Sequence, residues 1–130
     1  MKKVVIFGSR EFTNYEYAEM FISALDDSEI EIVSGCARGA DKIGEKYALE
    51  HDVNLYKFPA NWSKYGKSAG FVRNNEMAEF CDFGICFWDG SSSGTKHMID
   101  SLKKRNKPCY IILYNENKII DPKVSNTYPH

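Results

Sequence analysis

Small residues gather in four short segments of this chain, two of which also contain an arginine, and that combination is typical of anion binding. The segments are residues 8–10, 34–41, 59–70 and 89–94. Glycine lets the backbone come close to a ligand, and a guanidinium group matches the oxygens of a phosphate with two parallel hydrogen bonds. These residues therefore predict a pocket for a ligand that carries a phosphate.

The strongest of these signals is the stretch from residue 81 to residue 102. An apolar strand is expected at 83–88, a glycine- and serine-rich turn at 89–94, and a helix that opens at Thr95. The backbone N–H groups at the start of a helix are free to bind an anion. We therefore expect this turn to hold a phosphate, with these ligand-binding residues: Gly90, Ser92, Gly94 and Thr95.

Two earlier loops repeat the pattern. Gly8, Ser9 and Arg10 follow the first apolar run, and Gly35, Arg38 and Gly39 follow the second. Asp41 has two interpretations of equal weight. As an acid in the first turn of a helix it favours the helix dipole, and as a ligand residue it accepts a hydrogen bond from a sugar hydroxyl.

The third helix and the loop before it add further candidates. Arg73 and Asn74 stand near the helix start, where they either line the pocket or tie down neighbouring loops; we favour the pocket. Trp62 either plugs the core or stacks on a base. Asp89 either caps its turn, binds a metal or meets a sugar hydroxyl. No catalytic residue is identified, although Arg73 and Asp89 are candidates.

Alternating strands and helices must position these loops. Strands are expected at 3–7, 30–33, 53–58, 83–88 and 109–113, with helices at 14–26, 40–48, 71–80 and 95–105. This order predicts a Rossmann-like three-layer α/β/α fold around a mostly parallel five-stranded sheet. In such a sheet every strand-to-helix loop lies at the carboxyl edge, which is where ligands bind. Residues 1–113 form the expected domain, and residues 114–130 form an extension or an edge strand near 118–120.

Composition excludes several classes of function. The net charge of −1 argues against a nucleic acid or a membrane surface as the partner. The four cysteines and three histidines lack metal-ligand spacing, so neither a metal site nor a cofactor is predicted. The first apolar run is too short for a signal peptide, and no run is long enough to span a membrane. A cytoplasmic protein is expected.

Taken together, the loop motifs resemble those of the SLOG superfamily, in particular its small YspA-like members from bacteria and their phages. The resemblance covers about residues 3–113, and it implies a Rossmann-like fold, a nucleotide site and a homodimer. The motifs that carry it are G-S-R at 8–10, S-G-x-A-R-G-A-D at 34–41, P-A-x-W at 59–62, Y-G-K-x-A-G at 65–70, R-N-x-x-M-A at 73–78 and W-D-G-x-S-x-G-T at 88–95.

The same superfamily includes the lonely-guy phosphoribohydrolases, which release a base from a nucleoside monophosphate. Arg73 matches their catalytic arginine, but Met98 stands where they have a glutamate. A carboxylate stabilises the oxocarbenium-like transition state of this cleavage, and a thioether cannot. Asp41, Asp89 or Asp100 would have to replace it.

The sequence therefore favours a protein that binds a nucleotide or a nucleotide-derived small molecule, as a sensor or a sequestering protein. The first alternative is a nucleotide N-glycosidase that lacks the usual glutamate. The second alternative is a single-stranded DNA binder, which the near-neutral charge disfavours.

Overall fold

The computed structural model describes residues 1–25 and 29–122, and within these residues six strands form one sheet. The sheet order is β3-β2-β1-β4-β5-β6, and every neighbouring pair is parallel except β5 and β6. The strands are β1 (Lys2–Gly8), β2 (Ile30–Ser34), β3 (Leu55–Lys57), β4 (Phe83–Trp88), β5 (Cys109–Leu113) and β6 (Lys118–Ile120).

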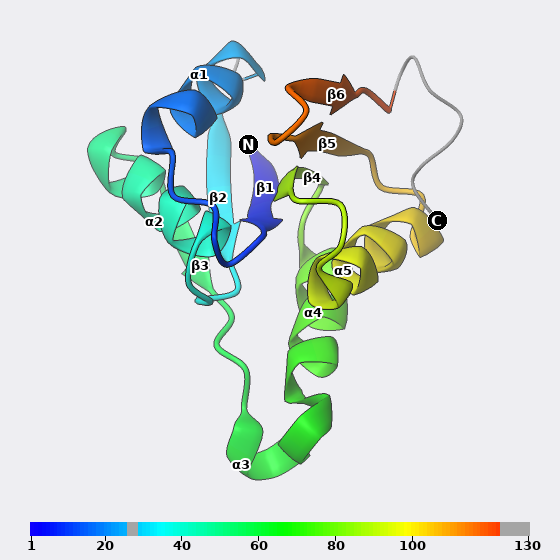
Figure 1. The fold of residues 1–130 in the computed structure, drawn as a ribbon. Helices are drawn as coiled ribbons and strands as arrows, with labels where there is room; N and C mark the ends of the chain where they lie inside the picture. The colour runs from blue at the N-terminus through cyan, green and yellow to red at the C-terminus, as the bar shows by residue number, and fades with distance from the viewer. Residues whose placement is uncertain (26–28, 123–130) are drawn as a thin grey trace.

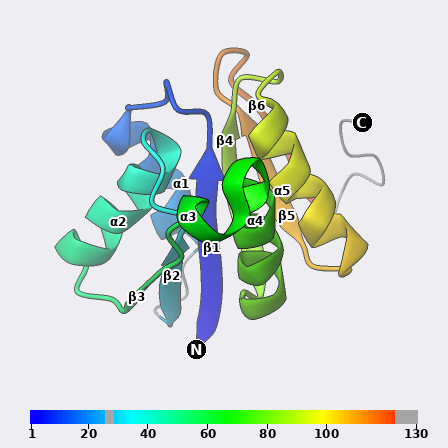
Figure 2. The same ribbon diagram turned by 90° about the horizontal axis from the view of Figure 1, so that it is seen from below.

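Helices cover both faces of this sheet (Figures 1 and 2). Val4 and Ile6 of β1 face one core, which α1 and α2 close. Val5 and Phe7 face the other core, which α4 and α5 close. This alternation follows from the period of two in a strand. The helices are α1 (Tyr15–Leu25), α2 (Ala40–Glu50), α3 (Trp62–Tyr65), the 3₁₀ helix η1 (Gly66–Ser68), α4 (Ala69–Phe80) and α5 (Ser93–Lys104).

The predicted three-layer Rossmann-like fold is confirmed, with differences in detail. The sheet has six strands rather than five, because residues 118–120 pair antiparallel with β5 at the edge. β3 is shorter than the expected 53–58, and α4 begins two residues earlier than expected. Residue 26 of the first expected helix, and residues 123–130 of the expected extension, lie outside the described residues.

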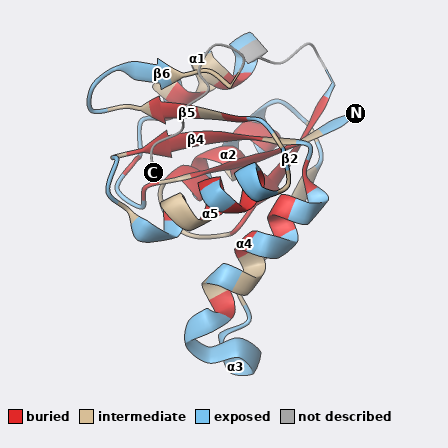
Figure 3. Ribbon diagram, turned by 90° about the vertical axis from the view of Figure 1, so that its right-hand side faces the viewer, coloured by how far each residue is buried: buried red, intermediate tan, exposed pale blue. Residues whose placement is uncertain are grey.

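The connection from β3 to α4 is the part of the fold that the sequence described least. The expected loop at 59–70 contains α3 and η1, and neither has a buried residue. Asn61 begins α3 because its side chain accepts a hydrogen bond from the Lys64 N–H. Figure 3 shows this segment projecting from the sheet, with exposed residues along its length. We call residues 59–68 the arm.

Candidate functional site

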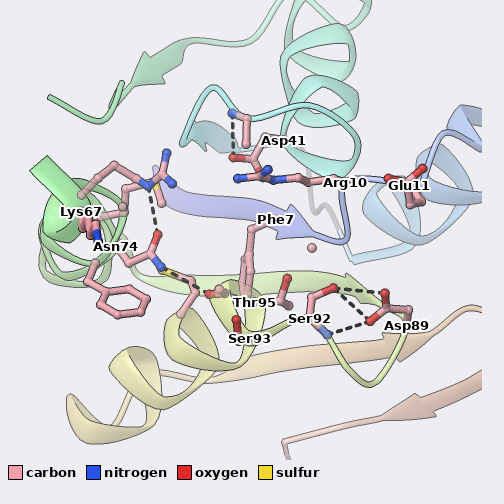
Figure 4. Close-up of a pocket in the computed structure, with 18 of the residues that line it drawn as sticks. Phe7, Arg10, Glu11, Asp41, Lys67, Asn74, Asp89, Ser92, Ser93 and Thr95 are labelled. Atoms are coloured by element: carbon pink, nitrogen blue, oxygen red, sulfur yellow. Dashed lines mark hydrogen bonds between the residues drawn. The ribbon is translucent and has the colours of Figure 1, made fainter. Parts of the chain in front are cut away.

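A pocket of about 550 Å³ opens at the carboxyl edge of the parallel strands (Figure 4). The loops after β1, β2 and β4 and the start of α4 all contribute to it, as the topology of the sheet predicts. Ten of the fifteen predicted ligand residues line it: Gly8, Arg10, Asp41, Trp62, Arg73, Asn74, Asp89, Ser92, Gly94 and Thr95.

The other five predicted residues do not line the pocket, and most of them shape its loops. The Ser9 hydroxyl accepts a hydrogen bond from the Asp89 N–H at 2.9 Å, which ties the β1 loop to the β4 loop. A Cβ at Gly39 would lie 2.4 Å from the Ser9 carbonyl oxygen. Gly90 supplies a positive φ of 89° to its turn. Arg38 points to solvent instead, where it pairs with Glu11 at 3.0 Å.

Arg73 is held in the pocket by two hydrogen bonds. Its Nε donates to Asn74 Oδ1 at 3.0 Å, and its Nη1 donates to the Gly35 carbonyl oxygen. A Cβ at Gly35 would lie 2.8 Å from both Arg73 Nη1 and Asp41 Oδ2, so only glycine leaves room for this arrangement. The Arg73 Nη2 group lies 3.8 Å from the position that a Cβ would take at Gly70, three residues earlier in α4. Arg73 therefore presents a fixed donor to a ligand.

The start of α5 provides the second set of donors. The first N–H groups of an α-helix have no carbonyl partner within the helix, and the Ser92 side chain does not cap them. The Ser92 hydroxyl bonds to the Asp89 carboxylate instead, at 3.0 Å from Oδ1. No atom lies within 4 Å of the position a Cβ would take at Gly94. The pocket lined by Gly94 is therefore open to an anion beside these N–H groups.

Asp89 organises its own turn. Its Oδ1 accepts hydrogen bonds from the N–H groups of Ser91 and Ser92, at 2.8 and 3.0 Å, and from both hydroxyls. Burial tends to raise the pKa of this carboxyl, but the four hydrogen bonds outweigh that effect and hold the pKa below its usual value. The capping interpretation of Asp89 accounts for all of these contacts.

Asp41 is buried beneath the same pocket. Its side chain accepts a hydrogen bond from the Ala37 N–H at 3.2 Å, so it braces the β2–α2 loop. Burial raises the pKa of this carboxyl to about 6, against the opposing effects of the Ala37 N–H and the Arg73 charge. The folded protein therefore binds a proton at Asp41 more readily than the unfolded chain does.

This difference predicts a pH-dependent stability. The stabilisation by protonated Asp41 is complete below the ordinary Asp pKa of 3.8 and disappears as the pH rises through about 6. Urea unfolding measures the free energy of unfolding of the wild type and of Asp41→Asn, which does not titrate at this position. As the pH rises from 3.8 to above about 6, the wild type should lose about 3 kcal/mol of stability relative to Asp41→Asn. The exposed surface variant Asp100→Asn is the control. A wild-type minus Asp41→Asn difference that stays constant with pH would contradict the assignment.

The pocket also contains nine residues outside the predicted ligand set, among them Lys67, whose positive charge the sequence places at this edge. They are the apolar floor residues Phe7, Met77 and Met98, the rim residues Glu11, Ala37 and Ser93, and the α3–α4 residues Lys67, Gly70 and Phe71. Phe71 is 51% exposed, and its ring stacks on His97 with the centroids 4.1 Å apart. The aromatic Phe71 two residues before the R-N motif is the signal that was available in the sequence.

Three cationic side chains in the pocket face three acidic ones. Arg10, Lys67 and Arg73 line it together with Glu11, Asp41 and Asp89. Glu11 pairs with Arg38 outside the pocket, and the Asp89 carboxylate is bonded by its own turn. The three cationic groups, by contrast, have side-chain N–H groups available to a ligand, so the pocket favours an anion.

The pocket offers little to the glycosidase chemistry. Met98 is buried in the pocket wall at the position where the resembling hydrolases have a carboxylate. Asp100 pairs with Lys96 on the surface at 3.0 Å and does not line the pocket. Within residues 1–25 and 29–122, no group of three or more His, Cys, Asp or Glu side chains could hold a metal ion, and none of the helices is long and apolar enough to cross a membrane.

Two solved structures have the same fold. DNA processing protein A from Helicobacter pylori superposes with a TM-score of 0.65 at 21% identity, and the match covers 85% of this chain and 64% of that one. DNA processing protein A from Streptococcus pneumoniae gives a TM-score of 0.67 at 19% identity, covering 85% and 49%. The chain thus spans about two thirds and one half of these proteins. The Helicobacter structure is described by its single-stranded DNA binding mode.

This comparison corrects two expectations from the sequence. We expected a nucleotide-like small molecule, sensed or sequestered, and the near-neutral charge disfavoured a nucleic acid partner. Both are wrong, because a protein of this fold binds single-stranded DNA, and the findings favour the second alternative. The physical reason is that net charge averages over the whole chain, whereas a strand requires only local cations and exposed aromatic rings.

The family follows from two sequence comparisons. The model of the YspA, cpYpsA-related SLOG family matches residues 2–65. The Gene 61 protein of Mycobacterium phage D29 is 32% identical over 117 residues, which are 83% of this chain and 94% of that protein. The family model's match includes the loops at residues 8–10 and 34–41. The chain therefore belongs to the YspA, cpYpsA-related SLOG family.

Proposed function

We propose that this protein binds single-stranded DNA, with part of the strand seated in the pocket at the carboxyl edge of the sheet. The observation that carries the proposal is a pair of exposed aromatic rings at a cationic pocket. Trp62 and Phe71 line the pocket and remain 59% and 51% exposed. Unpaired bases stack on such rings irrespective of sequence, whereas the bases of a duplex are already stacked on one another.

The donors beside these rings suit the strand backbone. A Cβ at Gly70 would lie 3.8 Å from Arg73 Nη2 and 3.9 Å from Trp62 Cη2, so the guanidinium and the indole border the same small opening. A base on Trp62 would place its phosphate within reach of Arg73, and the free N–H groups of α5 would receive a neighbouring phosphate. Arg10 and Lys67 add positive charge on opposite sides of the pocket.

The comparisons support this function rather than another use of the pocket. The Helicobacter protein of the same fold is described by its binding of single-stranded DNA, and in this chain Met98 lines the pocket where the resemblance to the lonely-guy hydrolases implies a glutamate. Such a strand would be met in the cytoplasm, the location expected from the sequence.

The aromatic rings provide the direct test. Trp62→Ala and Phe71→Ala should each weaken the binding of a fluorescent oligothymidylate by about 5- to 100-fold, because stacking contributes about 1–3 kcal/mol per base. Fluorescence anisotropy measures the dissociation constants. Quenching of Trp62 on titration gives a second readout, since the other tryptophan, Trp88, is buried.

Tyr65→Ala is the matched control, because Tyr65 is an exposed aromatic residue of the same arm that does not line the pocket. Its dissociation constant should stay close to that of the wild type. A duplex of the same length should bind far more weakly than the single strand. Failure of the wild type to bind the oligonucleotide, or equal affinity for duplex and single strand, would overturn the proposal.

A further inference from the structure

A chain of hydrogen bonds connects Arg73 of α4 to His97 of the neighbouring helix α5. The Asn74 side chain is buried between α4 and α5. Its Oδ1 accepts from Arg73 Nε at 3.0 Å, and its Nδ2 donates to His97 Nδ1 at 3.2 Å and to the Gly94 carbonyl oxygen at 3.4 Å. Asn74 thus joins the guanidinium in the pocket to the imidazole on α5.

The orientation of the Asn74 amide decides whether Arg73 is held. If the amide turned over, its NH₂ group would face Arg73 Nε, and two donors would oppose each other. His97 Nδ1 fixes the correct orientation because, as a neutral ring nitrogen, it accepts from Asn74 Nδ2. The Gly94 carbonyl oxygen is the longer and weaker of the two acceptors.

His97 itself is set in place by its neighbours. Its ring stacks on Phe71, at 4.1 Å between centroids and 21° between planes. The charged groups that act on it are Asp100 and Lys104 of its own helix, and from α4 it meets the uncharged Phe71 and Asn74. Burial lowers the pKa of His97, Lys104 assists and Asp100 opposes, so the ring is neutral at neutral pH.

We propose that His97, acting through Asn74, is a positioning residue that holds the Arg73 guanidinium in its strand-binding orientation. This inference rests on the proposed function, because it assigns His97 a role in binding the strand that Arg73 contacts. His97 need not touch the DNA. Its Nδ1 acceptor keeps the Asn74 amide turned toward Arg73.

The consequence is a pH dependence of unusual sign. Protonated His97 donates at both ring nitrogens, so the Asn74 NH₂ group would lose the closer of its two acceptors, and the amide would turn its oxygen toward the charged ring and away from Arg73. Strand binding should then weaken in acid. General electrostatics predict the opposite, because a more positive protein binds a polyanion more tightly.

The experiment compares the wild type with two variants by anisotropy, using an oligothymidylate. His97→Gln keeps an acceptor that does not titrate, and His97→Phe keeps a ring against Phe71 without any acceptor. The wild type and His97→Gln should bind about equally near pH 7.5, and the wild type should become about 5-fold weaker than His97→Gln as the pH falls through the pKa of His97. His97→Phe should be about 5-fold weaker than the wild type near pH 7.5. Asp41 is present in all three proteins, so its own titration cancels in the ratios.

Linkage gives a second readout. If protonation of His97 weakens binding about 5-fold, the bound strand must lower the pKa of His97 by about 0.7, which an NMR titration of the imidazole resolves. A wild-type to His97→Gln ratio that does not change with pH would overturn the positioning role while leaving the proposed function intact. Absence of binding by the wild type near pH 7.5 would overturn the proposed function and this inference together.

Discussion

Replacing Arg73 with alanine is expected to weaken the binding of single-stranded DNA by about 10- to 100-fold, a loss whose lower limit exceeds that expected for either aromatic ring. A hydrogen bond to a charged group contributes about 1.5–3 kcal/mol, and Arg73 offers a guanidinium already held by Asn74 and Gly35. Because these bonds fix its position before the strand arrives, little conformational freedom is lost on binding.

Two variants make this prediction specific. Arg73→Lys keeps the charge but loses the planar fork, so its affinity should fall between those of the wild type and the alanine variant. Arg38→Ala removes the same charge from an exposed ion pair outside the pocket and should change the affinity little.

Anisotropy titrations at several salt concentrations provide the measurement, with circular dichroism to confirm folding. The slope of log K against log salt should fall by about 0.7 in Arg73→Ala, as expected for one lost phosphate contact on a single strand. Equal losses in Arg38→Ala and Arg73→Ala would show that charge alone, rather than the placement of Arg73, governs binding.

The largest effect on stability is expected for Gly8→Ala. Gly8 has a φ of 150°, and a Cβ there would lie 1.9 Å from the Phe87 carbonyl oxygen of the neighbouring strand. Backbone cannot move aside as a flexible side chain can, so the end of β1 would have to separate from β4. We expect a loss of about 3 kcal/mol or more in the free energy of unfolding.

Gly94→Ala is the matched control for this prediction. It makes the same change in the first turn of α5, at the same edge of the sheet, but no atom lies within 4 Å of the added methyl group. Its unfolding free energy in urea should stay within about 0.5 kcal/mol of the wild type. Failure of Gly8→Ala to accumulate as a folded protein would be the stronger form of the expected result. Equal stability of the two variants would contradict it.

The contrast between these two glycines shows what a sequence motif leaves open. Both lie in loops that the sequence assigned to phosphate binding. In the structure Gly8 is required by the backbone of β4, whereas no protein atom requires the absence of a side chain at Gly94. Only the second glycine therefore leaves space that a ligand can use.

The layers of the fold, and the edge of the sheet at which the pocket lies, could be predicted from the amino-acid pattern alone. Apolar runs alternate with helical periodicity, right-handed crossovers make the sheet parallel, and a parallel sheet brings every strand-to-helix loop to one edge. Local patterns and chain handedness suffice for that, so Arg73 and Thr95 could be placed together without coordinates. The edge strand at 118–120 was left open because three residues carry too little pattern.

Which side chains face the pocket became clear only from the packed fold. Arg38 and Arg73 are equally plausible ligands in the sequence, but Glu11 draws Arg38 to the surface while Asn74 and Gly35 hold Arg73 inside. The pairing of Asn74 with His97, and the exposure of Phe71 beside it, join residues more than twenty positions apart. Side-chain direction at such positions depends on contacts between elements, and those contacts exist only once the helices have packed.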